Sequence, residues 1–159
     1  MEIERLESSA LGDLLELYQH LHDSDDPPPD DAVAHQTWEK IVSSPDMHCF
    51  GIRQQEQLVS TCFIALLPNL TRACRPYAVI ENVVTHADHR GQGYARALLQ
   101  YALQHAWQQD CYKVMQLTRQ QYMSRSGQLK CARSRRGARP RVYSLGKRRY
   151  TELAHLGCP

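Results

Sequence analysis

The chain has 159 residues, of which 42% are hydrophobic and 23% are charged, and its formal net charge is +2. These values are typical of one soluble globular domain with its own core. The apolar stretches are far shorter than the ~20 residues of a membrane helix, and the charged start Met1-Glu2-Ile3-Glu4-Arg5 lacks the pattern of a secretory signal. We therefore expect a cytoplasmic protein with no membrane partner.

The first part of the chain predicts a strand followed by two helices. Ile3 to Leu6 has the pattern of a short strand, and apolar residues at helical spacing predict a helix from about Ala10 to His22. The prolines and aspartates from Asp23 to Asp31 end this helix, and Asp30 or Asp31 can cap a second one. We expect the inner side of the second helix to consist of Val33, Thr37, Trp38 and Ile41.

The next elements are predicted to be three strands, a helix and a last strand. The strand-like runs His48 to Arg53 and Leu58 to Leu67 flank four polar residues, as in a hairpin. Tyr77 to Thr85 is a third strand, Gly91 to Gln109 is a strong helix, and Val114 to Thr118 is the last strand. The apolar stripe of this helix consists of Ala95, Leu98, Leu99, Ala102 and Ala106. The order β-α-α-β-β-β-α-β predicts an α/β fold in the α+β sense, with helices on a mixed, largely antiparallel sheet.

The sequence changes character after Thr118. Residues 1–118 hold eight Lys and Arg against sixteen Asp and Glu, a net charge of −8, whereas residues 119–159 hold eleven against one, a net charge of +10. Helical and strand periodicity also end there, so we divide the chain into a core, 1–118, and a basic, irregular tail, 119–159. Three explanations of the tail remain open: a basic extension that binds nucleic acid, a divergent ending that folds on a partner, or a change of reading frame near residue 118.

Cysteine and histidine spacing indicates neither a disulfide framework nor a metal site. The six cysteines include no CxxC pair, and Cys49 and Cys62 lie in apolar strands, where buried thiols are expected. His86 and His89 flank Asp88 without a third ligand nearby. We expect no metal.

The segment from His89 to Arg96 is the part of the sequence that indicates a ligand-binding site. It lies between a predicted strand and a strong helix, and a helix N-terminus with free N–H groups attracts phosphate. Gly91 and Gly93 allow close approach to the backbone, and Arg90 adds a guanidinium. A dinucleotide fingerprint would need a third glycine where Arg96 stands. A glycine-containing helix start without a ligand is the alternative.

The segment Arg90-Gly91-Gln92-Gly93-Tyr94-Ala95 resembles the pyrophosphate motif of the GNAT superfamily of acetyltransferases, Q/R-x-x-G-x-G/A. The element order from Ile3 to Thr118 is also similar to that of the family. The resemblance implies an acetyl-CoA-dependent N-acetyltransferase, an acyltransferase, whose amine substrate attacks the thioester directly in a ternary complex. It places the pantetheine arm along Val83, Val84 and Thr85. It places the pyrophosphate on the backbone of Arg90, Gly91, Gln92, Gly93, Tyr94, Ala95 and Arg96.

The resemblance also implies roles in the reaction. The N–H of Val83 or Val84 would polarise the thioester carbonyl, and Glu81 would take the proton of the amine. Burial in an apolar strand would raise the pKa of Glu81 towards a useful range, although a structural carboxylate is the alternative. The expected acceptor is a small-molecule amine or amino sugar. The acidic segment Asp23 to Asp31 would attract such a cation or would simply be a solvated loop.

The chain departs from the family after Thr118. Members have a further helix and often an FYxxxGF sequence, in which a tyrosine commonly protonates the leaving thiolate; here Tyr122 matches poorly and no general acid is assigned. If the reading frame changed, the part that closes the thioester cleft is missing and we expect reduced activity. Two further alternatives are a non-catalytic acyl-CoA binder and a nucleic-acid-binding protein with a basic tail. Many relatives pair through their terminal strands, so a homodimer is also open.

Overall fold

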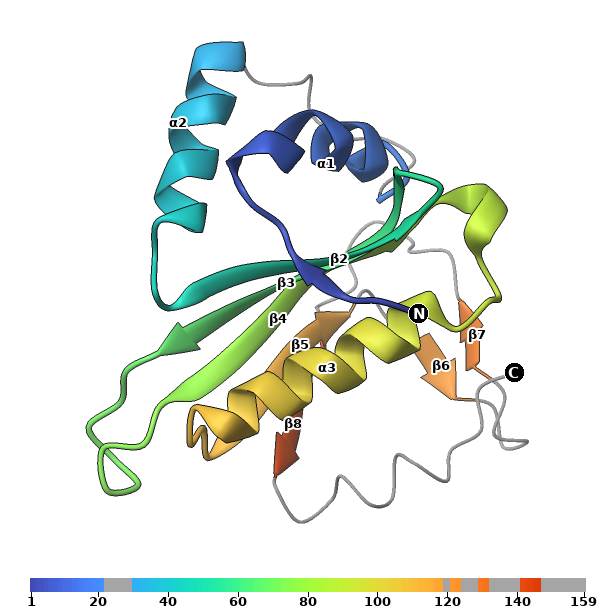
Figure 1. Ribbon diagram of the computed structural model, residues 1–159. Helices are drawn as coiled ribbons and strands as arrows, with labels where there is room; N and C mark the ends of the chain where they lie inside the picture. The colour runs from blue at the N-terminus through green and yellow to red at the C-terminus, as the bar shows by residue number, and fades with distance from the viewer. Residues whose placement is uncertain (22–29, 119–120, 124–128, 132–140, 147–159) are drawn as a thin grey trace.

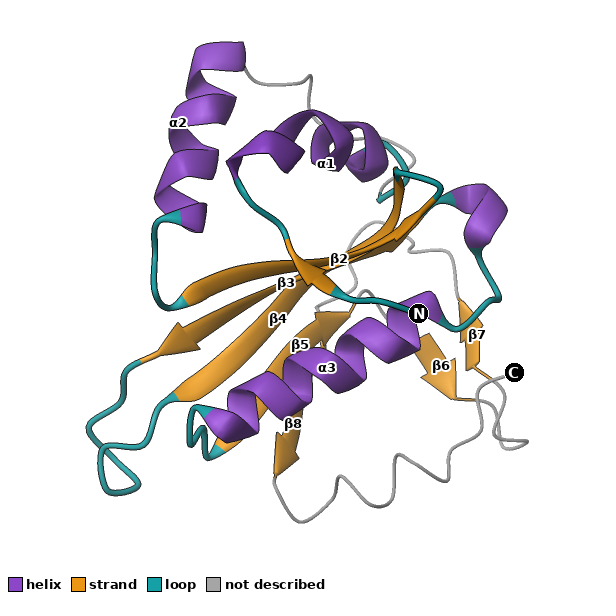
Figure 2. Cartoon of the chain, in the orientation of Figure 1, coloured by secondary structure: helices purple, strands orange, loops and turns teal. Residues whose placement is uncertain are grey.

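A computed structural model of the chain describes residues 1–21, 30–118, 121–123, 129–131 and 141–146 (Figure 1). The elements of these residues, coloured by type in Figure 2, are in chain order β1 (Glu4–Arg5), η1 (Ser8–Ala10), α1 (Leu11–Tyr18), α2 (Asp31–Val42), β2 (Met47–Gln54), β3 (Gln57–Leu67), β4 (Tyr77–Thr85), η2 (Ala87–His89), α3 (Tyr94–Gln108), β5 (Lys113–Thr118), β6 (Gln121–Met123), β7 (Leu129–Cys131) and β8 (Arg141–Gly146).

The strands form one large mixed sheet. Its order is β1-β2-β3-β4-β5-β8, and β4 and β5 run parallel whereas its other neighbours run antiparallel. The short strands β6 and β7 pair with each other in a second sheet. A mixed sheet covered by helices confirms the predicted fold class.

Helices cover both faces of the large sheet. Figure 1 shows α1 and α2 on one side and α3 on the other. The α3-side core includes Ile64, Ile80, Leu98, Ala102 and Val114. The core under α1 and α2 includes Leu14, Leu17, Trp38, Cys49 and Val84. Removing these apolar side chains from water on both faces holds the layers together.

The first helix is shorter than predicted. The sequence predicts a helix from about Ala10 to His22, but α1 ends at Tyr18. The N–H groups of Gln19, His20 and Leu21 each donate to the carbonyl three residues earlier, at 2.9–3.2 Å. The chain therefore leaves the α-helix through tighter 3₁₀-type turns, which periodicity does not distinguish from a helix.

The second helix is rotated relative to the prediction. Its cap is confirmed, because the Asp30 carboxylate accepts a 2.8 Å hydrogen bond from the Ala32 N–H. Trp38 is buried as predicted, but Val33 is 55% exposed and Thr37 is also exposed. The indole N–H of Trp38 donates to the carbonyls of Glu7 and Ser8, both at 3.2 Å. This contact sets the rotation, so the residue one turn earlier, Ala34, lies inward instead of Val33.

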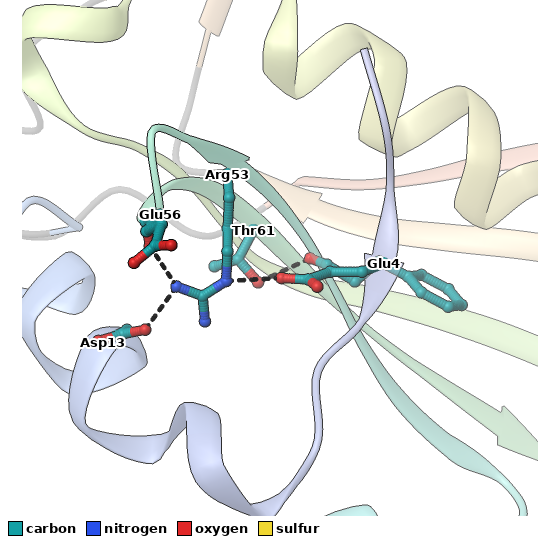
Figure 3. A network of polar contacts seen from close by, with 6 residues as sticks. Glu4, Asp13, Arg53, Glu56 and Thr61 are labelled. Atoms are coloured by element: carbon teal, nitrogen blue, oxygen red, sulfur yellow. Dashed lines mark hydrogen bonds and ion pairs between the residues drawn. The ribbon is translucent and has the colours of Figure 1, made fainter.

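The predicted hairpin of β2 and β3 is confirmed. Gln54 pairs with Gln57, and the two residues between them have positive φ angles of 48° and 71°, as in a two-residue hairpin turn. The side chain of Arg53 connects this hairpin to its surroundings (Figure 3). Its guanidinium donates hydrogen bonds to the Glu4 carboxylate at 2.8 Å, to the Asp13 carboxylate at 2.6 Å and to the Glu56 backbone carbonyl at 2.6 Å. One side chain thus joins β1, α1 and the turn.

The buried thiols are also confirmed. Cys49 and Cys62 are free and buried. Burial raises the pKa of Cys49 to about 11 and that of Cys62 to about 12. Both thiols therefore stay protonated at neutral pH and act as small core residues.

The tail contributes three strands that the sequence does not predict, β6, β7 and β8. No element is predicted after Thr118, yet β8 pairs antiparallel with β5, from Lys113 opposite Gly146 to Thr118 opposite Arg141. A strand of this kind depends on the free edge that β5 offers, which local periodicity does not reveal. The division of the chain at residue 118 and the three explanations of the tail stay predictions. Most of the acidic segment from Asp23 to Asp31 lies outside the described residues.

Candidate functional site

Strands β4 and β5 pair over only part of their lengths. The paired residues run from Ala78 opposite Val114 to Ile80 opposite Gln116. From Glu81 to Thr85, β4 pairs with β3 and with no other described strand. Backbone groups on this open edge can pair with an extended ligand, as an added strand would.

A bulge lies where the two strands part. Thr61 of β3 is opposite Val84, and Phe63 is opposite Glu81, so Asn82 and Val83 together face one residue of β3. Asn82 has a φ of +50°, the left-handed conformation that usually requires glycine at this point of a bulge. Because of the extra residue, the side chains of β4 before and after the bulge do not follow one regular alternation between the two faces of the sheet.

The open edge has identifiable N–H groups. The N–H of His86 donates to Val59 of β3 at 2.9 Å, and the carbonyl of Val84 accepts from the Ser60 hydroxyl at 2.9 Å. Because successive backbone groups of a strand point to alternate sides, the N–H groups of Val83 and Thr85 point towards the open edge. The sequence left Val83 and Val84 as alternatives, and this geometry favours Val83.

The glycine turn leads into α3 with two left-handed residues. Gly91 and Gly93 have φ angles of +79° and +82°, and Gly93 is the N-cap of the helix without a side-chain cap. The first helical hydrogen bond runs from the Ala97 N–H to the Gly93 carbonyl, so earlier N–H groups have no helical partner. A Cβ at either glycine would meet no atom within 4 Å. Glycine is therefore needed for its backbone angle, and the space above it is open to an anion.

Arg90 contacts the protein itself. Its Nε donates to the Thr85 carbonyl and its Nη2 to the His20 carbonyl, both at 3.2 Å. The sequence predicts a guanidinium available to phosphate, whereas the structure gives Arg90 a second task, joining the end of α1 to the end of β4. His20 was not singled out in the sequence, because nothing local marks a backbone carbonyl as an acceptor.

The remaining motif residues divide into buried and exposed. Tyr94 is only 8% exposed, and its hydroxyl donates to the Gln92 side chain at 3.1 Å. Ala95 is half-buried, and Arg96 is exposed. Tyr94 can therefore offer a ligand its amide, while its ring packs in the core and anchors the turn.

Glu81 lies on the α1/α2 side of the sheet. It is opposite Phe63, which is opposite Cys49 on the next strand, and directly paired residues face the same side. Cys49 belongs to the core under α1 and α2. Glu81 is half-buried, and burial raises its pKa above the ordinary value. Phe63 and Val79 are also half-buried on this face, so the carboxylate has an apolar surface beside it.

The histidines beyond β4 belong to the loop. The ring of His86 accepts a 3.3 Å hydrogen bond from the Asp88 N–H and lies 4.2 Å from the ring of His20. In the part of the chain that the structure describes, no three His, Cys, Asp or Glu side chains are placed to hold a metal ion. Likewise, no helix among the described residues is long and apolar enough to span a membrane.

Parallel strands that diverge beside a glycine turn and a helix N-terminus define this as an N-acyltransferase type of fold. The chain belongs to the acetyltransferase (GNAT) family, whose family model matches residues 11–126. No match is found among curated proteins.

Solved structures agree with this assignment. A protein from Agrobacterium tumefaciens str. C58, assigned as an acetyltransferase, is 39% identical with a TM-score of 0.69, and the match covers 74% of this chain and 81% of that one. An acetyltransferase of Trypanosoma brucei is 27% identical, with a TM-score of 0.65 and coverages of 74% and 82%. Glucosamine-6-phosphate N-acetyltransferase of Arabidopsis thaliana shares the fold at 23% identity, with a TM-score of 0.66 and coverages of 72% and 80%.

Proposed function

We propose that this protein transfers the acetyl group of acetyl-CoA to a primary amine of a small molecule or amino sugar, by direct attack in a ternary complex. The observation that carries the proposal is the open edge of β4 beside the uncapped N-terminus of α3. The family match supports the same activity. A cytoplasmic location and a homodimer remain proposals from the sequence.

The residues present fit acetyl-CoA. The open edge at Val83 and Thr85 offers backbone groups to the amides of a pantetheine arm. Past this edge, the turn from Gly91 to Ala95 offers N–H groups and the positive end of the α3 dipole to a pyrophosphate. One extended ligand could therefore run along β4 and onto the N-terminus of α3.

Two groups would carry the reaction. The N–H of Val83 donates to the thioester carbonyl oxygen and stabilises the negative charge that develops there. Glu81 accepts a proton from the amine, directly or through water. The amine lone pair then forms the C–N bond as the C–S bond breaks, and the CoA sulfur leaves with the bonding pair and takes up a proton. The raised pKa of Glu81 makes it a better base than an exposed carboxylate.

Calorimetry tests the cofactor half of the proposal. We expect acetyl-CoA and CoA to bind the wild-type protein, and Gly93→Glu to weaken binding by placing a bulky anion at the phosphate site. Gly12→Glu is the matched control, since Gly12 lies exposed in α1 with open space around it. Absence of binding at millimolar ligand would contradict the proposal.

Thiol release tests the transfer half. Incubation with acetyl-CoA and a panel of primary amines, including amino sugars, should release CoA thiol with at least one acceptor. Tight CoA binding without thiol release across the panel would instead identify a non-catalytic acyl-CoA binder.

The charge of the tail supports a second candidate, nucleic-acid binding. Residues 119–159 carry a net charge of +10, which would give salt-dependent affinity for DNA or RNA. Because β8 belongs to both the tail and the large sheet, deleting the tail would disturb the fold. Changing Arg133, Arg135, Arg136 and Arg139 to Gln is the sharper test, and unchanged binding would exclude this candidate.

A further inference from the structure

Ser60 contributes a fully buried hydroxyl to the end of β4. It lies on β3 directly opposite Thr85, the last residue of β4, and its exposed fraction is 0%. Its Oγ donates to the Val84 carbonyl at 2.9 Å and lies 2.8 Å from the Thr85 hydroxyl. A buried hydroxyl needs such partners, because a polar group without one is costly away from water. The last two residues of β4 supply both.

The direction of each of these hydrogen bonds follows from the protons available. A serine hydroxyl has one proton, and Ser60 gives it to the Val84 carbonyl, which has no proton of its own. The bond between the two hydroxyls therefore takes its proton from Thr85. Donation thus runs from the Thr85 hydroxyl to the Ser60 hydroxyl, and from there to the Val84 carbonyl.

This chain of hydrogen bonds returns to Thr85 through the backbone. The carbonyl of Val84 and the N–H of Thr85 belong to one planar peptide unit, and this N–H points towards the open edge of β4. Hydrogen bonds in a chain polarise one another, so a carbonyl that accepts a bond makes the N–H of its own peptide a stronger donor. Ser60 thus acts on the open edge through the peptide unit between Val84 and Thr85.

The following peptide unit is also held by the protein. Its carbonyl, that of Thr85, accepts from Arg90 Nε at 3.2 Å. Its N–H, that of His86, donates to the Val59 carbonyl at 2.9 Å. Together with the bond from Ser60, these contacts fix the end of β4 on both sides. The Thr85 N–H lies between them and faces the open edge.

We propose that Ser60 is a positioning residue, which orients the Thr85 N–H and strengthens it as a donor to an amide carbonyl of the pantetheine arm. That the ligand is CoA rests on the proposed function. The chain of hydrogen bonds from Ser60 to the Thr85 peptide does not.

The first experiment uses the ligand-free protein. Ser60→Ala removes the donor to the Val84 carbonyl, so the ¹⁵N resonance of Thr85 should shift. Hydrogen exchange of the His86 amide should also be faster, because the end of β4 is held less firmly. Unchanged resonances and exchange at Thr85 and His86 would overturn the proposal.

Thr61→Val is the matched control for this experiment. Thr61 is the neighbouring buried residue of β3, and its hydroxyl donates to the Phe50 carbonyl on β2 at 2.8 Å. Its loss should therefore shift the amide of Gly51, which shares a peptide unit with that carbonyl, more than the amide of Thr85. Equal shifts of the Thr85 amide in Ser60→Ala and Thr61→Val would show that the Ser60 hydroxyl has no specific effect and would overturn the proposal.

The second experiment compares two ligands by calorimetry. Ser60→Ala should bind CoA about five- to tenfold more weakly, as expected for one weakened hydrogen bond. Its affinity for ADP, which has the pyrophosphate but no pantetheine arm, should change less than about twofold. Thr61→Val should keep the wild-type affinity for CoA. An equal loss for CoA and ADP in Ser60→Ala would overturn the proposal, because it would indicate a general disturbance of the site.

Steady-state kinetics separate positioning for binding from the reaction itself. In Ser60→Ala, KM for acetyl-CoA should rise while kcat stays within about twofold of wild type, because the proposed reacting groups at Glu81 and Val83 are unchanged. A fall in kcat with unchanged KM would overturn the assigned role.

Thr85 provides a second variant if Ser60→Ala does not fold. Thr85→Val removes the hydroxyl that donates to Ser60 and should weaken CoA binding by about threefold, since the chain loses its first bond. Thr85→Ser retains the hydroxyl and should bind CoA more tightly than Thr85→Val. Equal affinities of wild type and Thr85→Val would overturn the proposal. If the wild-type protein fails to bind CoA, the proposed function fails, and the amide spectra still decide the hydrogen-bonded chain.

Discussion

Arg90 and His20 are 70 residues apart in the chain, and Nη2 of Arg90 donates a 3.2 Å hydrogen bond to the His20 carbonyl. The last carbonyls of a helix lack intrahelical partners and carry partial negative charge. The Arg90 guanidinium donates to such a carbonyl just past the end of α1. It also donates to the Thr85 carbonyl at the end of β4. A residue that the motif assigns to phosphate therefore also fixes the position of the first helix.

Replacing Arg90 should destabilise the protein. We expect Arg90→Ala to lower the free energy of unfolding by about 1–2 kcal/mol, because two hydrogen bonds from a charged group are lost, and Arg90→Lys to lower it by less. Urea denaturation measures the change. Arg96→Ala, at an exposed position of α3, is the control and should stay within about 0.5 kcal/mol of wild type. Equal stability of the two alanine variants would show that the Arg90 contacts contribute nothing.

The glycines of the turn and of α1 should respond in opposite directions to the same substitution. Gly93→Ala places a Cβ on a residue with φ of +82°, which costs about 1–2 kcal/mol. Gly12→Ala lies in a helix with open space around the new methyl group, and should stabilise by roughly 0.5–1 kcal/mol. Thermal unfolding of both variants gives the sign, and acetyl-CoA affinity should fall only for Gly93→Ala.

Glu81 should determine the acidic limb of the pH–rate profile. As a base it acts only when deprotonated, so kcat should fall as the pH drops through its pKa, which burial raises above the ordinary value. Glu81→Gln should lower kcat by about 10²-fold or more and abolish that limb. Glu39→Gln, on the exposed side of α2, should keep the wild-type profile. A persistent limb in Glu81→Gln would assign the base to another group.

The same substitution has a consequence for stability. Since burial disfavours the charged form of Glu81, the native state bears a cost above the raised pKa that is absent at low pH. At neutral pH Glu81→Gln should therefore unfold at a slightly higher urea concentration than wild type. A lower midpoint would indicate that the carboxylate stabilises the fold, as a structural role would require.

His48 should make stability depend on pH in the acidic range. Burial, with His105 and Arg5 nearby, lowers the pKa of His48 from 6.5 to about 4. Between pH 6.5 and pH 4, His48 therefore binds a proton in the unfolded chain but not in the native state. The free energy of unfolding should fall as the pH drops through this range. Asp46 and the Pro45 carbonyl act in the opposite direction without reversing the shift.

Replacement of His48 isolates this contribution. In urea unfolding at several pH values, His48→Gln should lose stability less steeply than wild type, with a residual slope because burial also lowers the pKa of His105. His35→Gln, on the exposed face of α2, should match the wild-type slope. Identical slopes in all three proteins would contradict the assigned shift.

Local patterns in the sequence were enough for much of the fold. The strong stripe from Ala95 to Ala106 predicts α3, and the alternating or wholly apolar runs predict β2 to β5, because these patterns report which side of an element is buried. The Gly91–Gly93 turn is equally local, since a positive φ and a free helix N-terminus need only neighbouring residues. The family resemblance rests on these local features, and the family model confirms it.

The rest was decided by contacts between residues far apart in the chain. The rotation of α2 follows from the contact of Trp38 with Glu7 and Ser8, and the task of Arg90 follows from His20. The bulge at Asn82 and the added strand β8 depend on the neighbouring strands that receive them. The sequence by itself therefore determined the main elements up to Thr118 and the glycine turn before α3, because each arises from short-range periodicity and backbone angles. Only the tertiary structure decided on which face of the sheet Glu81 lies and where β4 is left without a partner strand beside β5, because both depend on pairing and packing between distant segments.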